Sequence, residues 1–408
     1  MRVVQFEVFT DSVKMSYEKI YLDYNATTPV DPRVLEVVAQ VSQENFGNPS
    51  SSHCFGRSSA EIVRRARMQV ASLLNAEPEE IYFTAGGTES DNLALKGVLF
   101  PHILQARKPH LIISAVEHPA VAESCRYLES LGVQITTLPV AADGTITPSQ
   151  VADALQDNTV LVSLMLANNE TGVLFPLAEI AKLTNPRGVL LHTDAVQAFG
   201  KVAIDVKSLG VDILSISGHK VYAPKGVGAL WVSSRVELEP LVHGGGQESG
   251  LRSGTENLAG MAGLGMACEI LSGGMADEGS RIRELRNRLE SQLDEALDQQ
   301  LIFHGHRQSR VPNTSSLSVP YIDGESLLAH LDIEGIAVSA GSACSSGEHQ
   351  GSPVLRAMGI SSDLAQGSLR ISLGRWTTMA EIDVFVEKFT AIVRSLWDIS
   401  PLYRKKLK

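Results

Sequence analysis

The sequence predicts an α/β fold, in which a large domain is built on a mostly parallel central sheet and is joined to a smaller α+β domain. Length is the first observation, because 408 residues exceed what one ordinary hydrophobic core covers. The second is the alternation of short apolar runs with helical patterns through the middle of the chain. The third is a change of hydrophobic pattern after Gly273 and Gly274, from which long amphipathic helices are expected.

Seven apolar runs of strand length account for the predicted central sheet. In sheets of this kind, ligands bind at the carboxyl ends of the strands and at helix N-termini, so we expect the functional residues there. The runs cover residues 80–83, 111–114, 133–135, 160–164, 189–192, 212–214 and 228–232.

Two helices with one apolar face characterise the C-terminal part of the chain. Apolar residues recur at helical spacing from Ile282 to Leu297, and a second helix of this kind is expected from Glu381 to Trp397. Short strands and a glycine- and serine-rich loop lie between them. We therefore expect the large domain at 31–276 and the small domain at 15–30 and 277–408. The loop covers about 339–352, and residues 1–14 are expected to be an N-terminal extension.

Composition and charge limit the possible partners. Hydrophobic residues make up 44% of the chain and charged residues 20%, as in a soluble globular protein. The net charge of −11 disfavours nonspecific binding of nucleic acid or of an anionic membrane. No apolar run reaches the ~18 residues that span a bilayer. The four cysteines are scattered without metal-ligand spacing, which predicts free thiols, no metal site and a cytoplasmic location.

Two charged residues stand at the ends of predicted strands. Lys220 closes the stretch Ser217-Gly218-His219-Lys220, and a lysine in such a place can hold an aldehyde cofactor as a Schiff base. Asp194 follows the run that ends at His192, and a buried carboxylate there would suit a pyridinium nitrogen. An ordinary loop lysine and an aspartate that caps the next helix remain open at this point.

A glycine turn after the run 80–83 suggests a phosphate site. Thr88-x-x-Asp91 is typical of a capping box at the start of a helix, and the exposed N–H groups of that helix would bind an anion. A plain helix cap is the alternative. The chain has no nucleotide-binding Gly-x-x-x-x-Gly-Lys-Ser/Thr loop, so one phosphate fits better than three.

A phosphate site, a strand-end aspartate and a strand-end lysine together indicate pyridoxal 5'-phosphate. His118 follows another strand of the same sheet, where its imidazole could stack on the cofactor ring or transfer protons near neutral pH. A structural histidine is the alternative reading of this residue.

Cys344 differs from the other three cysteines in its surroundings. It lies among glycine, serine and alanine residues, which predict a flexible, exposed segment rather than a packed core. Such a thiol is a candidate nucleophile, although an incidental loop cysteine is the alternative. Cys54, Cys125 and Cys268 fall in or beside predicted helices and are interpreted as structural.

At this point the chain resembles the cysteine desulfurase family, which belongs to the pyridoxal-phosphate-dependent transferases of fold type I. The resemblance extends from about Ile20 to Trp397. Its ten motifs, which occur in the family's order, cover residues 21–29, 46–50, 86–90, 117–118, 168–172, 192–197, 217–220, 244–248, 252–255 and 341–344.

The resemblance implies a role for each cofactor-binding residue. Lys220 would form the Schiff base, Asp194 would pair with the ring nitrogen, and Gln197 would bind the ring hydroxyl. His118 would stack on the ring and assist proton transfer, and Asn169 would lie near the ring hydroxyl and the substrate. The phosphate would be bound by Gly87, Thr88, Ser217 and His219, together with Thr255 from the other subunit of a homodimer.

The resemblance also implies a reaction. Arg370 would bind the carboxylate of L-cysteine, and Cys344 would take the substrate sulfur as a persulfide while alanine leaves. The spacing from Cys344 to Arg370 matches the subgroup with a long catalytic-cysteine loop, which passes sulfur to an acceptor protein for iron–sulfur cluster assembly. Beyond a transient cluster at Cys344, no metal is implied. The polar segment after Cys344 and the short C-terminus depart from the usual pattern and put the usual acceptor in doubt.

Three other functions remain possible from the sequence. A selenocysteine lyase shares the fold and most of the motifs. An aminotransferase or decarboxylase of the same superfamily would explain Lys220 and Asp194 but would give Cys344 no role. An inactive sulfur-relay partner would not need Lys220, Asp194 and His118 together.

Overall fold

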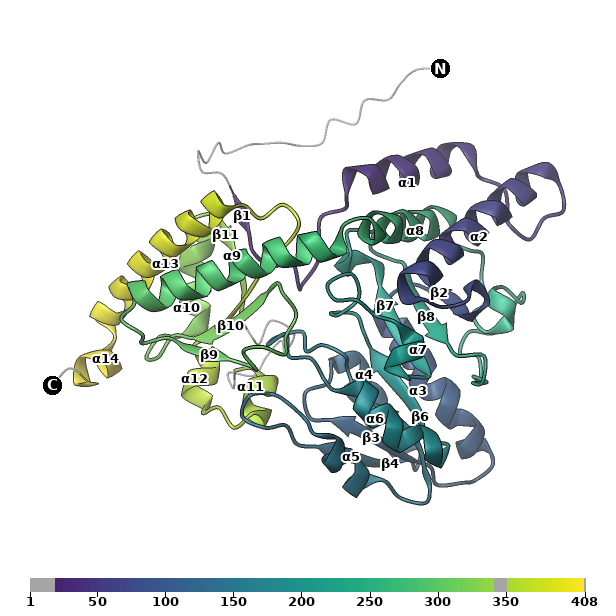
Figure 1. Cartoon of the computed structure of the whole chain (residues 1–408), viewed down its shortest axis with the longest axis horizontal. Helices are drawn as coiled ribbons and strands as arrows, with labels where there is room; N and C mark the ends of the chain where they lie inside the picture. The colour runs from purple at the N-terminus through teal and green to yellow at the C-terminus, as the bar shows by residue number, and fades with distance from the viewer. Residues whose placement is uncertain (1–18, 341–350, 407–408) are drawn as a thin grey trace.

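The computed structural model describes residues 19–340 and 351–406. Figure 1 shows a larger part around a central sheet and a smaller part that contains most of the C-terminal third of the chain. The N-terminal extension expected at 1–14 and most of the loop at 339–352, with Cys344, lie outside the described residues. The domain boundaries stay a prediction.

The central sheet has seven strands, and four of its six pairings are parallel. β8 is the exception, since it runs antiparallel to both of its neighbours. The α/β fold with a mostly parallel sheet is therefore confirmed. In spatial order the strands are β2 (Ile81–Thr84), β8 (Gly228–Val232), β7 (Ile213–Ser217), β6 (Leu190–Asp194), β5 (Thr159–Ser163), β3 (His110–Ser114) and β4 (Gln134–Leu138).

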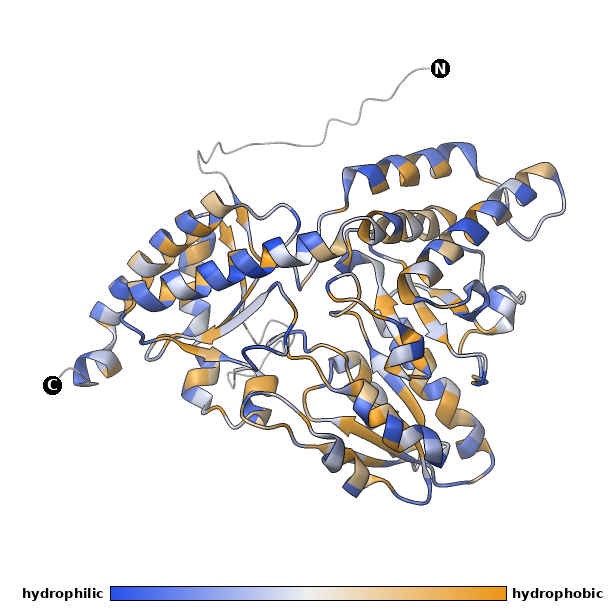
Figure 2. Ribbon diagram, viewed as in Figure 1, coloured by the Kyte–Doolittle hydropathy of each residue, from blue (hydrophilic) through white to orange (hydrophobic). Residues whose placement is uncertain are grey.

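Both faces of the central sheet are covered by helices, so most of its strands are buried, whereas the edge strand β4 is largely polar (Figure 2). Consecutive side chains point to opposite faces: Leu111 packs in one buried cluster, and Ile112 packs in another. α3 (Gly87–Leu104) and α4 (Pro119–Ser130) contribute to the first cluster. The second includes residues of α2 (Cys54–Leu74), α6 (Leu177–Thr184) and α8 (Leu258–Ser272). The other helices of this part are α1 (Pro32–Glu44), α5 (Pro148–Ala154) and α7 (Val206–Leu209).

A second sheet, of four antiparallel strands, organises the C-terminal part. Its order is β12 (Ser339–Ala340), β13 (Ser368–Ser372), β10 (Thr314–Ser318) and β9 (Ile302–His304). The first described strand, β1 (Ile20–Tyr21), pairs with β11 (Ile336–Ala337) beside it. The helices here are α9 (Met275–Ala296), α10 (Gly324–Ile333), α11 (Pro353–Ala357), α12 (Ser362–Gln366), α13 (Met379–Ile399) and α14 (Pro401–Lys406).

The chain enters the C-terminal part first and then crosses to the central sheet. Ile20 and Leu22 pack with Phe385 and other residues of α9, α10 and α13 in a third buried cluster. Immediately afterwards Asp23 bridges to Ser372 at the end of β13. The segment after Asp23 therefore lies between the two sheets, and this placement determines the geometry of the site.

No single described helix is long and apolar enough to cross a membrane. The pair α8 and α9, bent by 76° at a short break, passes such a test by length and composition alone.

Candidate active site

One cavity of about 860 Å³ collects ten of the predicted site residues. It lies where the carboxyl ends of β6 and β7 meet the segments that follow β2 and β3, the edge at which ligands were expected. The ten residues are Gly87, Thr88, His118, Asn169, Asp194, Gln197, Ser217, His219, Lys220 and Arg370. Thr255 is exposed and does not line the cavity, so its predicted role in a second subunit stays a prediction.

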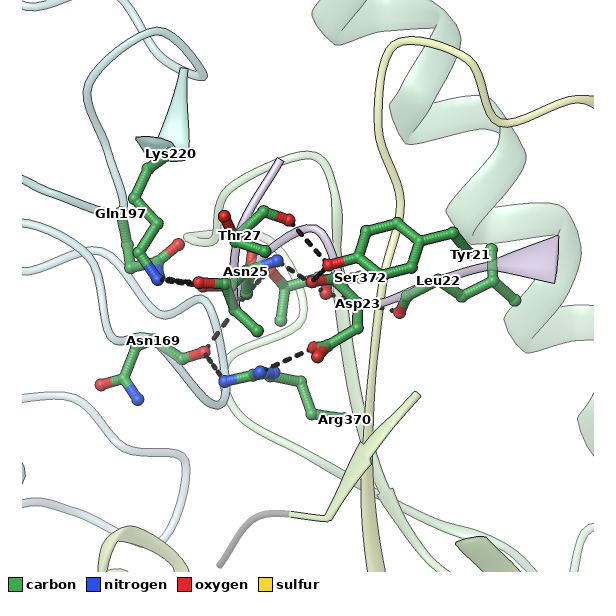
Figure 3. A network of polar contacts seen from close by, with 12 residues as sticks. Tyr21, Leu22, Asp23, Asn25, Thr27, Asn169, Gln197, Lys220, Arg370 and Ser372 are labelled. Carbon is green, nitrogen blue, oxygen red and sulfur yellow. Dashed lines mark hydrogen bonds and ion pairs between the residues drawn. The ribbon is translucent and has the colours of Figure 1, made fainter. Parts of the chain in front are cut away.

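Lys220 reaches the cavity from a 3₁₀ turn directly after β7. Its Nζ donates hydrogen bonds to the backbone oxygens of Asn25, at 2.6 Å, and of Ala26, at 2.7 Å (Figure 3). The turn packs closely, because a Cβ on Gly218 would lie only 2.9 Å from Val227 Cγ1. The lysine is thus held by a segment almost 200 residues away, and its interpretation as an ordinary loop lysine does not agree with this placement.

Asp194 is the last residue of β6 and is 6% exposed. Its Oδ1 accepts a hydrogen bond from the Val196 N–H at 2.9 Å. Burial raises the pKa of Asp194, while His118 and Lys220 lower it. A buried carboxylate with a partial set of partners is stabilised by an added cation, and a protonated ring nitrogen is a group of that kind.

His118 caps the N-terminus of α4, where its Nδ1 accepts a hydrogen bond from the Ala120 N–H at 3.1 Å. Burial lowers the pKa of His118, with Asp194 raising it and Lys220 lowering it further. The imidazole is therefore neutral near pH 7. Because Nδ1 is an acceptor, the proton of the neutral ring is on Nε2.

The predicted phosphate site lies at the start of α3 and the end of β7. The helix begins at Gly87, after Gly86, and no side chain caps it, so its first N–H groups are available to an anion. The predicted capping box of Thr88 and Asp91 is therefore wrong, because both residues lie inside the helix and Asp91 is buried. Ser217 lies against Gly87, where an added Cβ would be 3.4 Å from its Cβ.

Arg370 extends from β13 into the same cavity. Its Nη2 forms an ion pair with Asp23 Oδ1 at 2.8 Å, and its Nη1 donates to the backbone oxygen of Asn169 at 3.2 Å (Figure 3). Its Nε is buried and has no hydrogen-bond partner among the described residues. The guanidinium is thus fixed in place and retains donors for a carboxylate.

The residues that join these groups were not predicted from the sequence. Asn25 lies within the motif at 21–29, and it is 1% exposed at the centre of Figure 3. Its backbone oxygen accepts from Lys220 and Gln197, and its amide contacts Asn169 and Thr314. Its place in the motif at 21–29 was the signal that the sequence offered.

The residues present fit pyridoxal 5'-phosphate. The cavity combines a lysine amine, a buried carboxylate for a cationic ring nitrogen, a neutral imidazole and an uncapped helix N-terminus for a phosphate. Gly87 lies so close to Val196 that an added Cβ would come within 2.8 Å of Cγ2. The glycine therefore presents its backbone, and no side chain, where the phosphate would bind.

Known proteins share this fold and this length. The sequence profile of the family "Aminotransferase class-V", which uses pyridoxal phosphate, matches residues 20–385. "Cysteine desulfurase IscS" of Pseudomonas entomophila (strain L48) is 48% identical over 389 residues, which cover 94% of this chain and 95% of the relative. The chain therefore belongs to the class-V aminotransferase family and, within it, to the cysteine desulfurases.

Solved structures agree with this assignment. A "NifS-like protein" superposes with a TM-score of 0.87 at 36% identity, covering 93% of this chain and all of the other. A structure titled "SspA in complex with cysteine" has a TM-score of 0.76 at 35% identity, covering 88% of this chain and all of that one.

Proposed function

We propose that this protein converts L-cysteine to L-alanine and takes the sulfur onto Cys344 as a persulfide, for delivery to an acceptor protein. The observation that carries the proposal is the meeting of Lys220, Asp194, His118 and Arg370 in one cavity. The solved structure titled "SspA in complex with cysteine" supports L-cysteine as the substrate. A selenocysteine lyase stays the alternative.

The cofactor, when bound, supplies an electron-withdrawing ring that stabilises negative charge at the substrate Cα. Lys220 would hold it through the amine and would remove the Cα proton. Asp194 would keep the ring nitrogen protonated, and Gln197 and Asn169 would contact the ring hydroxyl. Neutral His118 would stack on the ring and would supply the proton on Nε2 for proton transfer. The phosphate would be bound by Gly87, Thr88, Ser217 and His219, with Thr255 from the second subunit of a homodimer.

The sulfur-transfer step needs the substrate to be held at its carboxylate. Arg370 binds that group with donors fixed in advance by Asp23 and Asn169. The Cys344 thiolate then attacks the substrate sulfur. A new S–S bond forms and the C–S bond breaks, leaving its electron pair on carbon. Protonation of that carbon gives alanine, and the persulfide passes to an acceptor in iron–sulfur cluster or other sulfur-cofactor biosynthesis.

Mass spectrometry of the protein incubated with pyridoxal phosphate and L-cysteine tests the proposal. We expect alanine in solution and one added sulfur on the peptide that contains Cys344. Cys344→Ser should abolish both products, whereas Cys54→Ser, which changes an exposed cysteine far along the chain, should leave them unchanged. Full alanine production by Cys344→Ser would refute the persulfide step.

A second comparison separates the alternative function. A selenocysteine lyase would retain selenium release from selenocysteine in Cys344→Ala, whereas the proposed desulfurase would lose alanine production from cysteine. Lys220→Ala should remove the visible absorbance of the bound cofactor, and an unchanged band would contradict the role of Lys220.

A further inference from the structure

A second lysine, Lys201, has its amine beside the active site and has no role in the proposed reaction. Its Nζ donates to Gln197 Oε1 at 2.6 Å and to Asn25 Oδ1 at 3.2 Å. Both acceptors are neutral amide oxygens. Lys201 does not line the large cavity, but it borders a small internal cavity of about 20 Å³ together with Lys220.

The local backbone places Lys201 over Gln197. The chain makes a helical turn after β6, in which the Phe199 N–H bonds to the Ala195 oxygen and the Val202 N–H to the Ala198 oxygen. Gly200, with φ of +72°, interrupts the helical backbone between Gln197 and Lys201 and lies against Val221 and Leu271. The Lys201 amine nevertheless reaches the Gln197 amide, four residues before it.

The contacts with Asn25 and Lys201 together determine which end of the Gln197 amide faces which way. A backbone oxygen can only accept a hydrogen bond, so the atom 2.9 Å from the Asn25 oxygen must be the amide nitrogen. The amide oxygen then lies on the other side, where it accepts from Lys201 Nζ at 2.6 Å. The second N–H of the amide nitrogen is left for the large cavity, which Gln197 lines.

We propose that Lys201 is a positioning residue that orients the Gln197 side chain, so that an amide N–H faces the ring oxygen of the bound cofactor. The proposal rests on the proposed function, because it assumes pyridoxal phosphate in the large cavity. Lys201 acts through Gln197 and touches neither substrate nor cofactor.

The charges around Lys201 favour this role over a structural ion pair. Burial of the amine lowers the pKa of Lys201 well below its ordinary value, and two nearby cations, Lys220 and Arg370, lower it further. The remaining titratable groups at the small cavity are Glu278, Tyr24 and Tyr222. Glu278 already pairs with Arg375 at 2.9 Å. Removing the Lys201 amine therefore leaves no buried carboxylate without its counter-ion.

A pH titration of the visible absorbance of the holoenzyme tests the proposal in Lys201→Met. Without the oriented N–H donor, more negative charge stays on the ring oxygen and holds the proton on the neighbouring Lys220 nitrogen. We expect the midpoint to rise by about one pH unit and cofactor binding to weaken. Lys207→Met, the same change at an exposed lysine, should leave the midpoint where the unmodified protein has it.

A double-mutant cycle decides whether the effect passes through Gln197. In a Gln197→Leu background, Lys201→Met should add no further shift of the midpoint. An equal shift in both backgrounds, or no shift in Lys201→Met alone, would overturn the proposal. A protein that forms no visible band with pyridoxal phosphate would refute the proposed function instead. Should Lys201→Met not fold, Lys201→Leu, which also lacks a hydrogen-bond donor, should give the same shift.

Discussion

The pKa values of the carboxyl groups around the site depend more on burial than on charged partners. Burial is the largest cause of the raised pKa values of Asp91, Glu117 and Asp194, and each of the first two is raised further by Asp194. His118 and Lys220 oppose the effect at Asp194 alone among the three. Of these three carboxyl groups, Asp194 is therefore the one whose negative charge the site favours, and it is the group that we propose for the cofactor nitrogen.

Glu170 gives the fold a pH dependence of its own. Burial raises the pKa of Glu170 to about 7 from an ordinary 4.5, against the opposing effects of its hydrogen bond from Ser352 and of Arg370. The folded state binds this proton more tightly than the unfolded state, so stability falls as pH rises from 4.5 to about 7. Glu170→Gln should remove up to about 3 kcal/mol of that fall.

Thermal unfolding at a series of pH values measures this effect. Between pH 4.5 and about 7, the unmodified protein should lose more stability than Glu170→Gln. Above pH 7 the stabilities of the two proteins should change with pH in parallel. Glu36→Gln, at an exposed position of α1, serves as the control. Equal slopes for Glu170→Gln and the unmodified protein would contradict the prediction.

The described cysteines should differ in reactivity. Cys125 and Cys268 are buried, and burial raises the pKa of both thiols, that of Cys125 to about 12. Cys54 is exposed, so packing gives it no structural role, contrary to its interpretation from the sequence. In the folded Cys344→Ser variant, a thiol reagent should label Cys54 within minutes, and it should label Cys125 and Cys268 only after the protein unfolds. Labelling of Cys125 at the rate of Cys54 would contradict this assignment.

At the scale of single elements, the turn from β2 into α3 shapes the proposed phosphate site. The turn brings Gly87 so near Val196 that an added Cβ would lie 2.8 Å from Cγ2. Gly87→Ala should shift the helix N-terminus and weaken binding of pyridoxal phosphate roughly tenfold, since overpacking costs about 1–3 kcal/mol.

Equilibrium titration of the apoprotein with pyridoxal phosphate measures this loss. Gly273→Ala is the matched control, because its Cβ would meet nothing nearer than the Ile270 oxygen at 3.7 Å. Unchanged cofactor affinity in Gly87→Ala would show that the helix start does not hold the phosphate.

At the scale of the whole molecule, Arg375 joins segments from both parts of the chain. Its Nη1 pairs with Asp31 at 2.7 Å, its Nε pairs with Glu278 at 2.9 Å, and its guanidinium lies 4.1 Å from the ring centre of Tyr222. Asp31 caps the N-terminus of α1, Glu278 lies in α9, and Arg375 follows β13. The contact therefore couples the C-terminal sheet to the N-terminal helix.

Arg375→Met should lower the free energy of unfolding by about 3 kcal/mol, because it leaves a buried Asp31 with one cation fewer. Arg288→Met is the matched control, since both members of its pair with Asp383 are more than 40% exposed and the pair should contribute less than about 1 kcal/mol. Thermal or denaturant unfolding measures both variants, and equal losses would contradict the coupling.

Local patterns predicted much of the fold and of the site. Each of the seven apolar runs overlaps a strand of the central sheet, and the helix expected at 381–397 is α13 at 379–399. Lys220, Asp194 and His118 were predicted as site residues because ligands bind at the strand ends of such sheets, and all three line the large cavity. The start of α3 was predicted wrongly, because glycine there leaves the helix uncapped and Thr88 falls inside it.

By itself, the sequence determined the fold class, the family and the strand-end residues, since periodicity and motif order are local properties of the chain. Only the tertiary structure decided how these residues are held. Asn25 meets Lys220 across 195 residues, and Asp23 meets Arg370 across 347. Such contacts depend on how the segment after β1 passes between the two sheets, and the spacing of residues along a chain does not encode that path.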